Sequence, residues 1–171
     1  MDAAGNLSVD GKTVTVDLAG TEPVNVKHVN VSALVSSGQS RFSALRRFEL
    51  WACNNGSRFL HDGPRMDCSQ DSGFRKVSTS AANAFPGDVP RLASPILILR
   101  ELDIPNTKAT HLRLVVKANQ CSGGPEYQGD QDADPINNPD CDLNPTAAFR
   151  FVRAAEVQAF SDAGSVYCFD D

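Results

Sequence analysis

The sequence predicts an all-β protein whose antiparallel strands form a β-sandwich. Two segments carry this prediction, because apolar and polar residues alternate along them with a period of two. Valine and leucine occupy every second position in residues 12–18 (KTVTVDL), and leucine and valine do so in 111–117 (HLRLVVK). No convincing amphipathic helix separates the segments with this pattern. At this length we expect the jelly-roll version of the sandwich.

The other strand candidates are separated by turn residues. In the segment 24–34 the apolar residues change phase near Lys27 and His28, which predicts a β-bulge there, because one extra residue reverses the face. The apolar run ILIL at the start of 96–104 predicts burial on both faces. A connection is expected to begin at Asn106. Strands are predicted at 12–18, 24–34, 42–53, 74–80, 96–104, 110–117 and 149–160, with a long irregular segment at 119–146.

Length and charge narrow the functional classes. The 171 residues, 41% of them hydrophobic, are expected to form one β-sandwich domain over residues 1–171. The net charge of −5 and the scattered basic residues argue against nucleic acid and against a membrane-binding patch. No apolar run approaches the ~20 residues of a membrane-spanning helix. Met1 is either a native start or the start of a domain excised from a larger secreted protein, and the cysteines favour the second interpretation.

Five cysteines indicate an oxidising, secreted context. Cys53 and Cys68 bracket one segment of small and polar residues, and Cys121 and Cys141 bracket another. Neither pair has the Cys-x-x-Cys spacing of a zinc or redox site. We therefore expect two loop-closing disulfides in these pairings, although sequence alone does not fix their connectivity. Cys168 is left over, either as a free thiol or as the partner of a cysteine in a longer parent protein.

Four segments together resemble the galactose-binding-like, or discoidin-like, jelly roll. They are VNVKHVNVSALV at 24–35, RRFELWAC at 46–53, ILRELDIPNTKATHLRLVV at 98–116 and RAAEVQAF at 153–160. More narrowly, RFSALRRFELWAC together with the loop between Cys121 and Cys141 is similar to accessory domains of secreted bacterial metallopeptidases of the fungalysin type.

This resemblance implies a non-catalytic module. Many members of the family bind glycans through loops at one end of the sandwich, and many hold a structural calcium. The disulfides expected here close local loops, whereas typical discoidin domains join the two ends of the domain. That departure argues against the lipid-binding and coagulation-factor-like roles of the family.

The segment 126–142 is the candidate metal site. Oxygen ligands crowded into one loop suit calcium, and carboxylates held close together repel each other unless they are neutralised or solvated. An EF-hand is excluded, because Pro135 replaces the turn glycine and Cys141 stands where the bidentate glutamate would be. The alternative is a solvated acidic loop without metal. The candidate ligands are Asp130, Asp132, Asp134 and Asp140.

Four residues are candidates for contacting a ligand. Trp51, the only tryptophan, falls in the phase opposite Phe48 and is predicted to face away from the core, where it could stack on a sugar ring. It is buried instead if both faces of its strand are covered. His61, Arg65 and Tyr127 lie on expected loops, where fixed donors beside an aromatic ring suit sugar recognition.

Nothing in the sequence singles out a catalytic centre, and we expect no enzyme. The three histidines are dispersed, and the chain has no HExxH motif, no G-x-S-x-G elbow and no phosphate-binding glycine loop. The preferred interpretation is an extracellular binding module for a glycan or polysaccharide, accessory to a secreted enzyme. The alternative is a structural domain that packs on a parent peptidase and binds no small molecule. An unrecognised hydrolase is the third hypothesis.

Overall fold

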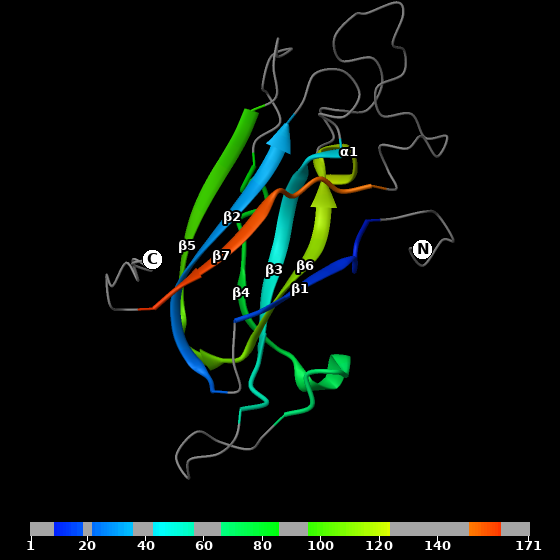
Figure 1. The fold of residues 1–171 in the computed structure, drawn as a ribbon. Helices are drawn as coiled ribbons and strands as arrows, with labels where there is room; N and C mark the ends of the chain where they lie inside the picture. The colour runs from blue at the N-terminus through cyan, green and yellow to red at the C-terminus, as the bar shows by residue number, and fades with distance from the viewer. Residues whose placement is uncertain are drawn as a thin grey trace, which may run out of the picture.

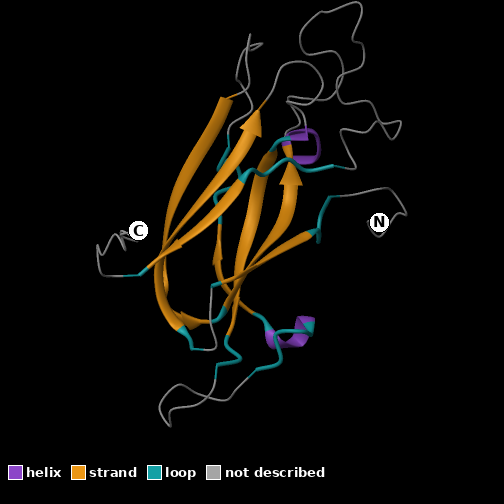
Figure 2. Ribbon diagram, in the orientation of Figure 1, coloured by secondary structure: helices purple, strands orange, loops and turns teal. Residues whose placement is uncertain are grey.

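The computed structural model describes residues 9–18, 22–35, 43–56, 66–85, 96–123 and 151–161, which form two antiparallel sheets packed face to face (Figure 1). The strands are β1 (Thr13–Asp17), β2 (Val24–Val35), β3 (Leu45–Cys53), β4 (Arg75–Thr79), β5 (Ile96–Ala109), β6 (His111–Asn119) and β7 (Glu156–Phe160). The two helical elements within the described residues are both short, η2 (Asp71–Gly73) and α1 (Gln120–Gly123) (Figure 2). The predicted all-β sandwich is confirmed.

The strands divide between a four-stranded sheet, in the order β1-β6-β3-β4, and a three-stranded sheet, in the order β5-β2-β7. Apart from β3 and β4, which are neighbours in one sheet, successive strands alternate between the two sheets, as in a jelly roll. Figure 1 shows β5, β2 and β7 together on one side and the other four strands behind and beside them. Every pair of strands within these sheets is antiparallel.

The core lies between the two sheets and follows the alternation in the sequence. On β6 the side chains of Leu112, Leu114 and Val116 are at most 2% exposed, while the residues between them are half-buried. Phe48 of β3 packs in the same core against Phe85, with 6.2 Å between the ring centroids. These inward faces are what hold the sandwich together, because burial of apolar surface is the main stabilising term.

The β-bulge predicted in the second strand is confirmed. The pairing of β2 with β5 shifts register between Val26 and His28. Val26 on one side of the shift and Val29 on the other are both buried in the core, at 1% and 0% exposure. The extra residue therefore keeps the apolar side chains of both halves of the strand on the inner face.

The predicted bounds of the fifth strand were wrong. β5 continues through Asn106 to Ala109, because its second half pairs with the start of β2, where Val24 lies opposite Ala109. The connection to β6 is thereby reduced to Thr110. The ILIL run is not buried on both faces either. Leu97 and Leu99 are 54% and 42% exposed, since they point away from the core on the outer face of the three-stranded sheet.

Two other boundaries differ from the prediction. β3 begins at Leu45, after a bridge at Ala44, and β7 begins at Glu156. The segment expected to be irregular begins with the short helix α1. No helix in the described part of the chain is long and apolar enough to cross a membrane.

Candidate functional site

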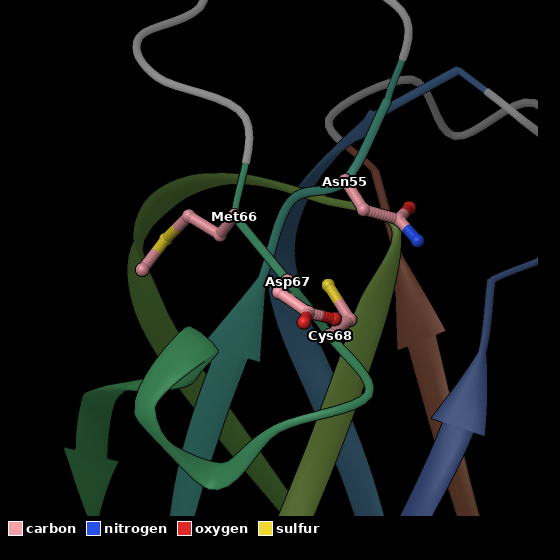
Figure 3. Close-up of a pocket in the computed structure, with 4 residues that line it drawn as sticks. All are labelled: Asn55, Met66, Asp67 and Cys68. Atoms are coloured by element: carbon pink, nitrogen blue, oxygen red, sulfur yellow. The ribbon is translucent and has the colours of Figure 1, made fainter.

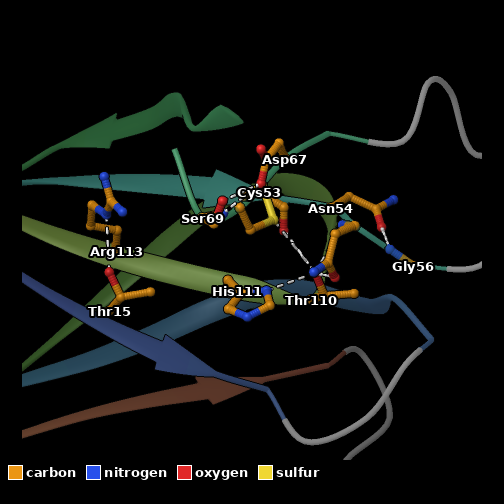
Figure 4. Close-up of a disulfide and its surroundings, with 11 residues drawn as sticks. Thr15, Cys53, Asn54, Gly56, Asp67, Ser69, Thr110, His111 and Arg113 are labelled. Atoms are coloured by element: carbon orange, nitrogen blue, oxygen red, sulfur yellow. Dashed lines mark hydrogen bonds between the residues drawn. A yellow bond between two sulfur atoms is a disulfide. The ribbon is translucent and has the colours of Figure 1, made fainter. Parts of the chain in front are cut away.

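A disulfide between Cys53 and Cys68 closes the loop that follows β3 (Figure 4). The two Cα atoms lie 5.7 Å apart across a separation of 15 residues. The first of the predicted pairings is therefore confirmed. Cys121 is also disulfide-bonded, and its partner lies outside the described residues, so its pairing with Cys141 stays a prediction.

Thr110 links the turn between β5 and β6 to the start of the loop that follows β3. Its hydroxyl accepts a hydrogen bond from the backbone N–H of Asn55 at 3.0 Å and donates to the side-chain oxygen of Asn55 at 2.8 Å. Its backbone N–H donates to the carbonyl of Cys53 at 2.9 Å. The side chain is 1% exposed, so these bonds are shielded from water. The start of the β3–β4 loop is thereby fixed to the β5–β6 turn.

The same hydroxyl lies 2.9 Å from Nδ1 of His111, within hydrogen-bond distance (Figure 4). It also lies 3.3 Å from the carbonyl oxygen of Cys53. His111 is half-buried on the outer face of the four-stranded sheet, opposite Cys53.

The end of the loop, residues 66–74, is folded tightly on itself. Asp67 accepts two hydrogen bonds on Oδ1, from the backbone N–H of Ser69 at 2.9 Å and from its hydroxyl at 2.6 Å. Gly73 lies so close to the carbonyl of Asp67 that a Cβ atom there would stand 1.9 Å from the oxygen. Met66 is tied back to Asn54 by a backbone hydrogen bond of 2.8 Å. A glycine is therefore required at position 73.

A pocket of about 320 Å³ opens beside the disulfide and is lined by Asn55, Met66, Asp67 and Cys68 (Figure 3). This volume is at the lower end of the range for small-molecule sites. Hydrogen bonds from Ser69 lower the pKa of the Asp67 carboxyl, so this exposed group is an anionic acceptor at neutral pH. The oxygen of Asn55 is held by Thr110, and among the described residues its side-chain NH₂ has no partner. The pocket thus offers a fixed acceptor, a fixed donor and the apolar chain of Met66.

The outer face of the four-stranded sheet carries Trp51, as the alternation predicted. The residue is half-buried and lies outside the core, between Arg113 of β6 and Lys76 of β4 in the strand register. Its indole Nε1–H donates to Glu49 Oε2 at 3.0 Å, and the ammonium of Lys76 donates to Oε1 at 3.2 Å. Burial alone would raise the pKa of Glu49, but these hydrogen bonds and the charges of Lys76 and Lys117 lower it.

Arg113 is held from three directions on the same face. Its guanidinium donates to Thr15 Oγ1 at 3.0 Å and to Asp71 Oδ1 at 2.6 Å. Its Cζ lies 3.6 Å from the centroid of the Phe74 ring, a cation–π contact. The side chain is only 13% exposed. This cluster fastens the end of the β3–β4 loop onto the sheet.

The other residues proposed from the sequence lie outside the described residues. These are the ligand-binding candidates His61, Arg65 and Tyr127 and the metal-binding candidates Asp130, Asp132, Asp134 and Asp140. Within the described ranges, no group of three or more histidine, cysteine or acidic side chains is arranged to hold a metal ion. Asn55 and Asp67 were missed by the sequence analysis. The signal available was their position just inside the two cysteines of a short disulfide loop.

Comparisons with known proteins give a structural likeness but no sequence family. No protein-family model and no curated protein matches the chain. Among solved structures, the chain is similar to CpGH89CBM32-5 from Clostridium perfringens, which was solved in complex with GalNAc-beta-1,3-galactose. The sequence identity is 20%, the TM-score is 0.33, and the match covers 63% of this chain and 55% of that chain. A likeness of this extent establishes neither a family nor a ligand for the protein.

Proposed function

We propose that the protein is a non-catalytic carbohydrate-binding module that recognises a sugar in the pocket beside the Cys53–Cys68 disulfide. The observation that carries the proposal is that the Asp67 carboxylate and the Asn55 amide both line one small pocket. A sugar hydroxyl both donates and accepts hydrogen bonds, so a fixed acceptor and a fixed donor in one pocket suit the hydroxyls of a sugar. The Met66 side chain supplies the apolar surface that a sugar ring also needs.

The polar side chains of the pocket are held in place without a ligand, and this supports binding there. Asn55 and Asp67 are each held by hydrogen bonds that do not involve a ligand, and the disulfide joins the two ends of their loop. Binding of a ligand therefore loses little conformational entropy of the site.

An extracellular location is part of the proposal. The Cys53–Cys68 disulfide favours an oxidising compartment, because such bonds are rare where thiols are kept reduced. A role as accessory to a secreted enzyme, and a fungalysin-type peptidase as that enzyme, rest on the sequence resemblance. Loops at one end of a sandwich are where that resemblance implies glycan binding, and the pocket is formed by such loops.

A glycan array tests the proposal, followed by titration calorimetry on any sugar that binds. Asn55→Ala and Asp67→Ala should each weaken binding of that sugar by about tenfold or more, as expected for the loss of one buried or charged hydrogen bond. Asn106→Ala and Glu101→Ala are matched controls, because both residues are exposed on β5 of the other sheet. No selective binding, or binding that neither pocket variant weakens, would overturn the proposal.

A second candidate function is supported by the other sheet. Leu97 and Leu99 are 54% and 42% exposed on the outer face of the three-stranded sheet, and Leu34, paired with Leu97, is half-buried. Adjacent exposed leucines are typical of a surface covered by another domain. This favours packing on a parent protein such as a peptidase domain. Fusion to that domain would then raise the melting temperature of the sandwich, and Leu99→Ser would remove the gain.

A further inference from the structure

Trp51 lies half-buried among polar side chains on the outer face of the four-stranded sheet. Glu49 lies two residues before it on β3, and the strand register places Arg113 on one side and Lys76 on the other. We call Trp51 and these three neighbours the Trp51 platform. Its members come from three adjacent strands, and strands hold side chains more rigidly than loops do.

The polar groups around the tryptophan are fixed in place. Glu49 accepts hydrogen bonds from both the indole N–H and the ammonium of Lys76, and its side chain is only 15% exposed. Arg113 is bonded to Thr15 and Asp71 and stacks on Phe74. A ligand that covers the indole therefore meets donors and acceptors that are already oriented.

The platform and the pocket lie close together along β3. Trp51 and Cys53 point to the same side of the strand, about 7 Å apart by the rise of two residues. Cys53 is joined to Cys68, which lines the pocket, with 5.7 Å between their Cα atoms. One sugar ring in the pocket would leave the tryptophan uncovered, but a chain of several sugars would reach it.

The geometry points to an extended oligosaccharide as the ligand, with one terminal sugar in the pocket and a later sugar stacked on Trp51. This inference rests on the proposed function and adds a second contact to it. An indole face suits the apolar C–H face of a sugar, and the flanking charged groups suit its hydroxyls. Phosphate-rich nucleic acid fits less well, because Lys76 and Arg113 are already neutralised by Glu49 and Asp71.

The chain offers a direct optical test, since Trp51 is its only tryptophan. Tryptophan emission is followed while the wild-type protein is titrated with oligosaccharides of increasing length. The probes are galactose-, xylose-, glucose-, mannose- and N-acetylglucosamine-based oligomers, from the monosaccharide to the hexasaccharide. We expect monosaccharides to bind without changing the emission. Longer oligomers of the same sugar should change it and bind more tightly.

Variants separate the two contacts. Trp51→Ala should weaken binding of the longest oligomer by about tenfold, the effect of losing one stacked aromatic contact, and leave binding of the monosaccharide unchanged. Trp51→Phe keeps an aromatic ring and should retain most of the affinity, which shows that the surface still folds. Phe160→Ala removes an aromatic ring that is 42% exposed on the other sheet, and it should change nothing.

The outcomes distinguish this inference from the function on which it rests. Oligomers that bind the wild type and Trp51→Ala equally, without a change in emission, would overturn the platform and leave the pocket standing. Failure of every oligomer to bind the wild-type protein would overturn the proposed function and the platform with it.

Discussion

The indole Nε1–H of Trp51 donates a 3.0 Å hydrogen bond to Glu49, two residues earlier on the same face of β3. The tryptophan is therefore held along its strand by a carboxylate that also binds Lys76. One charged group orients both an aromatic ring and a cation on the outer face of the sheet. The geometry of that surface consequently depends on the ionisation of Glu49.

Glu49→Gln should destabilise the protein by about 0.5–1 kcal/mol at pH 7, because the variant keeps the shape of the side chain and loses its charge. The folded pKa of Glu49 is lowered, so its contribution is present at neutral pH and is lost as the pH falls through that lowered pKa. Urea unfolding at pH 7 and pH 3 measures the difference between variant and wild type. That difference should shrink at pH 3.

Glu101→Gln is the control for this experiment. Glu101 is exposed on the three-stranded sheet, and its substitution should not change the free energy of unfolding at either pH. An effect of Glu49→Gln that is the same at pH 7 and pH 3 would mean that the charge of Glu49 contributes nothing.

The sequence predicts those features that depend on local alternation. The change of apolar phase near Lys27 was enough to locate the bulge, and the phase of Trp51 against Phe48 was enough to place it outside the core. The extension of β5 through Pro105 could not be read locally, because proline and asparagine favour turns. Pairing with Val24 and its neighbours overrides that preference.

The pocket could not be predicted for a related reason. Its two polar residues, Asn55 and Asp67, are positioned by a disulfide and by Thr110, which lies 55 residues from Asn55 in the sequence. A periodic pattern of apolar residues does not indicate contacts between residues that are so far apart in the sequence. Only the bracketing of the loop by Cys53 and Cys68 indicated that its ends would meet.

The contact between Arg113 and Phe74 should be measurable by a double-mutant cycle. Arg113→Met and Phe74→Leu each remove the cation–π interaction, so their combined effect on the free energy of unfolding should fall short of additivity by about 1 kcal/mol. Arg47→Met with Phe74→Leu is the matched cycle, since Arg47 is an exposed cation on β3. If the effects of Arg113→Met and Phe74→Leu on the free energy of unfolding simply add, the stacking makes no net contribution to stability.

Calcium binding by Asp130, Asp132, Asp134 and Asp140 stays a prediction of the sequence. If these residues hold a structural ion, calcium binds the folded state and raises its stability by mass action. The melting temperature should then be higher in millimolar calcium than in EDTA, and Asp132→Asn should reduce the difference. Equal melting temperatures in both buffers would leave the segment as a solvated acidic loop.

Gly73→Ala should disrupt the wall of the pocket without unfolding the sandwich. A Cβ atom at this position would stand 1.9 Å from the carbonyl oxygen of Asp67, and neither backbone can yield without moving the turn. We expect a loss of about 1–3 kcal/mol in stability, as for an overpacked site, together with weaker binding of any sugar that occupies the pocket.

Ser72→Ala, one residue earlier and exposed, is the control and should change neither quantity. A far-ultraviolet spectrum that remains that of a β protein would show that the effect is local. Wild-type stability in Gly73→Ala would mean that the loop has room to move, and that the pocket is less rigid than its hydrogen bonds imply.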